Sequence, residues 1–209
     1  MREIFELQRS LNVYTLKNIG LDFEEILSSP EQRPLWIENY RKALSAELAE
    51  LVREVRQNGF ESHNGKVEIV DMLHFLVSLS HLVNIGPDEV EPSRTAPSEG
   101  GFSDCVVRCF LALDDLQNSV KWKWWALGGG FKEDKAQEAV LRLWSSFHEI
   151  RRLFGLDFGP LKSLYVAKNR LNFQRQDRRY NEDTKSCLLY TSDAADDLLC
   201  VDLGGRRII

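Results

Sequence analysis

At 209 residues the chain is long enough to bury a full hydrophobic core without a stabilising cross-link, so we expect one domain or a tightly merged pair of domains. The formal net charge of -5, with no segment dominated by basic residues, argues against a nucleic-acid partner bound through its phosphates. No apolar run reaches membrane-spanning length and the first residues lack a signal-peptide pattern, so we expect a cytoplasmic protein with no membrane partner.

The first predicted element is an amphipathic helix over residues 3 to 18, where apolar residues recur at every third or fourth position. Gln8 and Asn12 lie one turn apart on it, so their amides point the same way. Two such amides can bind the donor and acceptor edge of a base, although a surface position is the commoner situation for each alone. Residues 20 to 34 are predicted to be a loop or a broken helix, after which Trp36 opens a long helix.

The sequence carries a pair of acidic motifs on two consecutive predicted helices. Glu47 and Glu50 form one pair and Glu68 and Asp71 the other, each with an i, i+3 spacing that puts both carboxylates on one helix face. Apolar residues surround the second pair, so part of its face must lie against other protein. A hairpin closed by the turn at residues 59 to 65 would gather four carboxylates, whose repulsion a divalent cation relieves best. Such oxygen ligands suit Mg²⁺, although paired acids are also common on solvated faces.

After a predicted linker at residues 86 to 101, the helical pattern starts again. Residues 111 to 122 resemble 44 to 55 in length and apolar phase, and residues 137 to 156 resemble 67 to 86. This suggests a degenerate duplication in which the second copy has lost most of its acids. The predicted fold class is therefore all-α: a helical bundle built from two degenerate helical hairpins plus N- and C-terminal helices, with one metal site.

Trp122, Trp124 and Trp125 stand between the two helices of the second hairpin. Three large rings are more than one buried stripe needs, so some of them line a pocket or a subunit interface, or else the core there is wide and aromatic. The apolar second hairpin and this aromatic run together offer more hydrophobic surface than a four-helix core needs. We therefore expect a homodimer.

The last predicted helix, at residues 161 to 180, places Lys168, Asn172 and Arg175 on one cationic, polar stripe. Tyr165 lies on the opposite, apolar side of the same helix. Such a stripe presents ammonium, amide and guanidinium donors to a polyphosphate, although a solvated face explains the same pattern.

Five segments, taken in order, resemble one known family. They are LQRSLN (7 to 12), AELAEL (46 to 51), EIVDMLHF (68 to 75), WKWW (122 to 125) and KNRLNFQRQ (168 to 176). Each motif is short, but the ordered set is similar to the dimeric, all-α dUTP nucleotidohydrolases, relatives of the MazG-type nucleoside triphosphate pyrophosphatases. The resemblance covers most of residues 5 to 180.

This resemblance implies a nucleotide hydrolase with Mg²⁺ as its cofactor. Its reaction would be the hydrolysis of dUTP to dUMP with release of pyrophosphate, and dUDP is a further candidate substrate. Glu47, Glu50, Glu68 and Asp71 would be the metal ligands. The catalytic residue that orients or deprotonates the attacking water would be Glu47 or Glu50, and no covalent nucleophile is needed.

The same resemblance implies the contacts of the protein with its nucleotide partner. Gln8 and Asn12 would belong to a base pocket that selects uracil, and His74 would lie near the nucleoside. The residues expected to hold the phosphates are Lys168, Asn172 and Arg175.

Three alternatives to a dUTP hydrolase stay open on the sequence alone. A MazG-type pyrophosphatase with another nucleotide preference would share the metal site, whereas a non-catalytic helical interaction module would show no Mg²⁺-dependent stabilisation. An inactive truncation product is the third, because residues 187 to 209 resemble translated sequencing adapter and the natural C-terminus would then be missing. We therefore expect a pyrophosphatase domain at residues 1 to 186 and an artefactual tail at 187 to 209.

Overall fold

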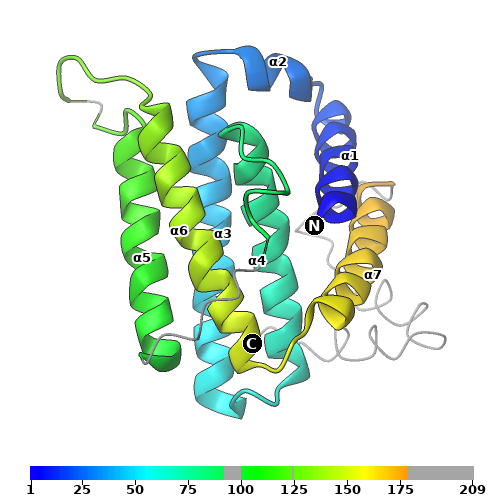
Figure 1. Cartoon of the computed structure of the whole chain (residues 1–209). Coiled ribbons are helices and arrows are strands. Elements are labelled where there is room, and N and C mark those ends of the chain that lie inside the picture. The colour runs from blue at the N-terminus through cyan, green and yellow to red at the C-terminus, as the bar shows by residue number, and fades with distance from the viewer. Residues whose placement is uncertain (92–99, 124, 178–209) are drawn as a thin grey trace.

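The computed structural model describes residues 1–91, 100–123 and 125–177, and every regular element in these ranges is a helix (Figure 1). The all-α prediction is therefore confirmed. The predicted tail at 187–209, with the domain boundary before it, lies outside the described residues. In chain order the helices are α1 (Arg2–Asn18), α2 (Phe23–Ser28), α3 (Gln32–Asn58), α4 (His63–Leu82), α5 (Gly101–Ser119), α6 (Glu133–Leu153) and α7 (Phe158–Asp177).

Two helical hairpins form the body of the bundle, as the sequence pattern predicts. α3 packs along α4 and α5 packs along α6, and the two pairs meet where α4 contacts α6 and α3 contacts α5 (Figure 1). α1 and α7 pack against each other and against α4, on the side of α4 away from α5 (Figure 1). α4 is therefore the central helix of the described bundle, because it contacts α3 of its own hairpin, α6 of the second hairpin, and both α1 and α7.

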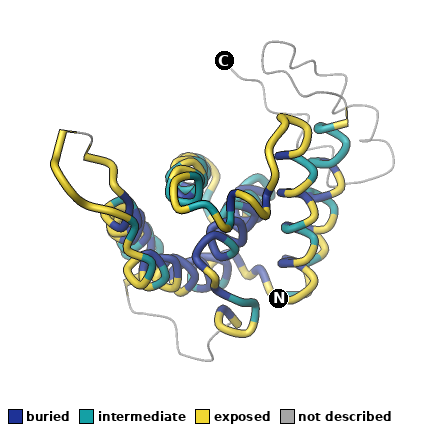
Figure 2. The backbone as a smooth tube through the Cα atoms, turned by 90° about the horizontal axis from the view of Figure 1, so that it is seen from above, coloured by how far each residue is buried: buried dark blue, intermediate teal, exposed yellow. Residues whose placement is uncertain are grey.

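The sequence of α4 suits this central place because it is apolar almost all round. Figure 2 shows buried positions gathered towards the middle of the molecule, with exposed ones on the outer faces. Ser62 caps α4 by accepting a hydrogen bond from the Gly65 amide at 3.1 Å. Gly65 must itself stay small, because a Cβ there would lie 2.4 Å from Cε1 of Phe154, just after α6. Even so, no helix in the described ranges is long and apolar enough to span a membrane.

The chain between α1 and α3 differs in detail from the prediction. Residues 20 to 34 contain the short helix α2, which Asp22 caps by accepting hydrogen bonds from two backbone amides. α3 begins at Gln32, earlier than the predicted start at Trp36. Pro34 is accommodated in the first turn, because the N–H that it lacks would have no partner inside the helix there.

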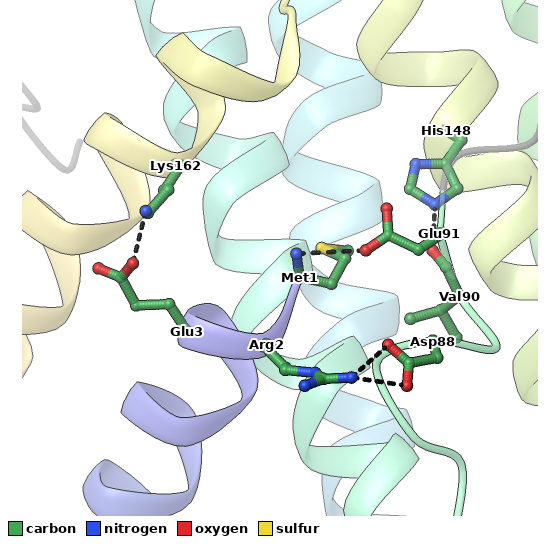
Figure 3. A network of polar contacts seen from close by, with 8 residues as sticks. All are labelled: Met1, Arg2, Glu3, Asp88, Val90, Glu91, His148 and Lys162. Atoms are coloured by element: carbon green, nitrogen blue, oxygen red, sulfur yellow. Dashed lines mark hydrogen bonds and ion pairs between the residues drawn. The ribbon is translucent and has the colours of Figure 1, made fainter.

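The segment after α4, predicted as a linker, is packed where it is described. Val90 is 3% exposed, and its carbonyl lies 2.9 Å from Nε2 of His148 on α6. Residues 92–99 of the predicted linker lie outside the described ranges. Three ion pairs hold the first turn of α1 between this segment and α7: the Met1 amine with Glu91 at 3.5 Å, Arg2 with Asp88 at 3.1 Å and Glu3 with Lys162 at 2.5 Å (Figure 3).

The aromatic loop between α5 and α6 lies at the surface. Trp122 and Trp125 are 37% and 61% exposed, so the alternative of a wide aromatic core is wrong for these two rings. Trp124 lies outside the described residues. The outer face of α5 carries a further set of exposed apolar side chains, which are Val107, Phe110 and Leu111.

Candidate active site

Three of the four predicted metal ligands come together on the first hairpin. Glu47 and Glu50 from α3 and Glu68 from α4 each place one carboxylate oxygen so that all three lie within 4.8 Å of one another. Glu68 is fully buried, and the other two are half-buried. Three carboxylates this close repel one another unless a cation compensates them. The donor set is made of hard oxygen atoms and therefore fits Mg²⁺.

Local sequence explains how the three acids reach one place. Leu48 and Leu51 belong to the buried stripe of α3. Glu47 comes directly before Leu48 and Glu50 directly before Leu51, so the two acids lie along the edge of that stripe. α3 ends at Gly59, whose φ of 75° lets the chain reverse into α4. The reversal lays α4 antiparallel along α3 and brings the buried face of α4 to the acids of α3.

Asp71, the fourth predicted ligand, has a different partner in the structure. It follows Glu68 by one turn on α4, but its Oδ2 accepts a hydrogen bond from Nζ of Lys168 on α7 at 2.9 Å. The side chains of Asp71 and Lys168 are only 17% and 9% exposed. The structure thus groups three of the predicted ligands and ties the fourth to α7, and the assignment of all four to a metal stays a prediction.

Gln8 and Asn12 are each 4% exposed, so the surface alternative is wrong for both. Nε2 of Gln8 donates to Oδ1 of Asn12 at 2.8 Å and to Oγ of Ser78 at 3.1 Å. Oε1 of Gln8 lies 2.6 Å from Nδ1 of His74 and accepts from the hydroxyl of Tyr165, also at 2.6 Å. We call Gln8, Asn12, His74, Ser78 and Tyr165 the amide network. It joins α1, α4 and α7.

The hydrogen-bond directions in the amide network follow from Ser78. Its single proton is directed at two acceptors, the carbonyl of His74 at 2.9 Å and Oδ1 of Asn12 at 3.2 Å, so Ser78 Oγ accepts from Gln8 and the nitrogen of the Gln8 amide faces Ser78. Gln8 Oε1 is then an acceptor, which requires the proton of His74 to sit on Nδ1. Burial, aided by the charge of Lys168, lowers the pKa of His74 to about 3. The imidazole is therefore neutral, and its Nε2 is a bare acceptor.

Three buried polar atoms at this place have no hydrogen-bond partner among the described residues: Nδ2 of Asn12, Nε2 of His74 and Nδ2 of Asn169. Asn169 is 3% exposed and follows Tyr165 by one turn. Burial raises the pKa of Tyr165, and the nearby Asn169 amide opposes that rise in part. A buried polar atom left unsatisfied costs about 1–3 kcal/mol, so this set of two donors and one acceptor is suited to a polar ligand.

The remaining predicted phosphate ligands lie further along α7. Asn172 and Arg175 are half-buried, and Nη1 of Arg175 donates to Oδ1 of Asn172 at 3.5 Å. Of the three predicted residues of the cationic stripe, Lys168 contacts Asp71 on α4. Their common role in holding phosphate stays a prediction.

The sequence-based reasoning missed Ser78, Tyr165 and Asn169. Tyr165 was assigned to the apolar side of its helix, and it is indeed fully buried, stacked on His74 with ring centroids 4.3 Å apart. A buried tyrosine hydroxyl nearly always needs a hydrogen-bond partner, and that rule was the available signal. The same rule points to Asn169, because its amide lies one turn from Tyr165 on the same side of α7.

The described residues thus form an all-α bundle whose first hairpin gathers three carboxylates within 4.8 Å of one another. The sequence model of the dUTPase family matches residues 1–180, and the chain belongs to that family. The predicted resemblance is thereby confirmed, and the family is one of nucleotide hydrolases. Comparison with curated proteins and with solved structures finds no match to this chain.

Proposed function

We propose that this protein hydrolyses dUTP to dUMP and pyrophosphate with Mg²⁺ as its cofactor, and that dUDP is a second candidate substrate. The observation that carries the proposal is the carboxylate cluster of Glu47, Glu50 and Glu68, within 4.8 Å in a member of the dUTPase family. These three residues, with Asp71 beside them, would hold the metal. When bound, Mg²⁺ neutralises the phosphates and lowers the pKa of an attacking water.

The protein's own residues have separate tasks in this reaction. Glu47 or Glu50 is half-buried at the edge of the cluster and accepts the proton of the attacking water. The ammonium of Lys168, with Asn172 and Arg175 on the same helix, holds the phosphates by charge-assisted hydrogen bonds. Hydrolysis in this scheme proceeds by direct attack of water, without a covalent enzyme intermediate.

The amide network supports uracil as the base. Uracil carries one donor, N3–H, between two acceptors, O4 and O2, whereas cytosine has a lone pair at N3. His74 Nε2 is a bare acceptor, and Asn12 and Asn169 offer donors, which are the kinds of group that the uracil edge requires. His74 Nε2 accepts the N3 proton of uracil in this arrangement and would meet a lone pair in cytosine. The mismatch corresponds to roughly 100-fold in kcat/KM, from about 1–3 kcal/mol for an unsatisfied buried group.

A nucleotide panel tests the proposal directly. Pyrophosphate release from dUTP, dCTP, dTTP and dATP should be measured with purified full-length chain and Mg²⁺. We expect dUTP to exceed dCTP by about 100-fold in kcat/KM. A different preferred base with Mg²⁺-dependent turnover would favour the MazG-type alternative, and the absence of Mg²⁺-dependent turnover or stabilisation would favour the non-catalytic interaction module.

We also propose that the protein is a homodimer that buries the outer face of α5. Val107, Phe110 and Leu111 on that face are 54%, 67% and 56% exposed, which is a large apolar group for a protein surface in water. A face of this kind on a single helix suits an interface between identical subunits. Light scattering tests this proposal: the native chain should have a dimeric mass that Phe110→Lys reduces to the monomer. A monomeric native mass at micromolar concentration would contradict it.

A further inference from the structure

The ion pair between Lys168 and Asp71 joins two helices at the acidic face of α4. Its N–O distance is 2.9 Å, and both side chains are largely shielded from water, with 9% of Lys168 and 17% of Asp71 exposed. Lys168 also contributes to the low pKa of His74, which places its charge near the amide network as well. The ammonium therefore acts on Asp71 and on the amide network alike.

The Asp71 carboxylate would bind a metal less strongly while it is paired with Lys168. It follows Glu68 by one turn on the same side of α4 but is not one of the three clustered carboxylates, and its Oδ2 is engaged by the ammonium. A divalent cation bound by all four acids would lie close to the ammonium even if it took the other oxygen, Oδ1, and the two positive charges would repel each other. The ion pair therefore opposes coordination of the metal by Asp71.

We propose that Lys168 is a built-in competitor of the metal, an internal counter-cation that occupies Asp71 until a divalent ion displaces it. This inference rests on the proposed metal site and concerns how that site is emptied and filled. The ammonium keeps the acidic face compensated when no metal is bound, and it weakens metal affinity by the strength of its contact with Asp71. Metal binding at Asp71 and the Lys168–Asp71 ion pair therefore oppose each other.

If Lys168 competes with the metal, its removal should strengthen metal binding, whereas removal of a residue that assists metal binding would weaken it. Lys168→Met removes the charge and keeps most of the aliphatic side chain, so it leaves Asp71 free for the metal. Mn²⁺ serves as the probe, with its dissociation constant measured by calorimetry on the full chain in the absence of nucleotide. We expect Lys168→Met to bind Mn²⁺ about fivefold more tightly than the native protein, the size of a strong ion pair near a protein surface.

A matched control separates competition from a general loss of positive charge. Arg170→Met makes the same charge change on an exposed position of α7, and we expect it to alter Mn²⁺ affinity less than twofold. The second control is the Asp71→Asn background, where the carboxylate that Lys168 occupies is absent. There Lys168→Met should no longer tighten Mn²⁺ binding. Circular dichroism checks that each variant keeps its helices, and Lys168→Gln replaces Lys168→Met if that variant fails to fold.

The outcomes distinguish this inference from the proposed function. If the native chain binds Mn²⁺ and Lys168→Met binds it no more tightly, or if the gain persists with Asp71→Asn, competition at Asp71 is overturned while the metal site stands. If neither the native chain nor Lys168→Met binds Mn²⁺, both the proposed metal site and the proposed competition are overturned. Tighter binding in Lys168→Met alone, lost in the Asp71→Asn background, supports the proposal.

Discussion

Removal of one hydroxyl by Tyr165→Phe tests the amide network at a fully buried position. The Tyr165 hydroxyl donates to Oε1 of Gln8 at 2.6 Å, and the ring stacks on His74. Phenylalanine keeps the stack and loses only the hydrogen bond. Because Gln8 Oε1 retains His74 Nδ1 as a second donor, the loss is limited to about 1 kcal/mol of unfolding free energy. For a chain of this size that lowers the melting temperature by about 2–4 °C.

The assay is thermal and urea denaturation of the native chain, Tyr165→Phe and a matched control. Tyr40→Phe is that control, because Tyr40 is half-buried and its hydroxyl makes no hydrogen bond with any described residue. We expect Tyr40→Phe to change stability by less than half of the Tyr165→Phe effect. In the same variants, the preference for dUTP over dCTP should narrow only for Tyr165→Phe, since its hydroxyl helps to orient Gln8. Equal losses in the two variants would refute the account of the network.

Two further predictions concern stability. Gly65→Ala places a Cβ 2.4 Å from the Phe154 ring and should cost about 1–3 kcal/mol, whereas Gly130→Ala, with open space around it, should cost little; urea midpoints compare the two. Burial lowers the pKa of His81 and of His148 to about 4, so between pH 6.5 and 4 the unfolded chain binds more protons than the folded one. The free energy of unfolding should therefore fall as the pH drops through that window, and urea midpoints unchanged between pH 7 and pH 5 would contradict this.

The periodicity of the sequence was sufficient to predict the bundle and the acidic cluster. An i, i+3 spacing fixes a common helix face whatever the helix packs against, so Glu47 and Glu50 are neighbours by geometry alone. The apolar composition of α4 likewise requires burial, and with it the burial of Glu68. Both inferences depend on local pattern, which a single sequence contains in full.

Contacts between residues far apart in the sequence could not be predicted from this local pattern. Lys168 and Asp71 are 97 positions apart, and nothing in either helix's own pattern selects that pairing over a metal or a solvated face. The polar partners of Gln8 come from α4 and α7, so its burial depends on three helices meeting. Trp122 shows the converse, because a large ring suggests burial while its loop extends from the end of the second hairpin (Figure 1).

The catalytic role of the carboxylate cluster is tested by Mg²⁺-dependent release of pyrophosphate from dUTP by the native chain, Glu50→Gln and Glu61→Gln. Glu50 belongs to the cluster, whereas Glu61 is an exposed acid in the turn of the same hairpin. We expect Glu50→Gln to lose at least about 100-fold in kcat while its helical content stays intact, and Glu61→Gln to keep native activity. Full Mg²⁺-dependent turnover by Glu50→Gln would contradict this role.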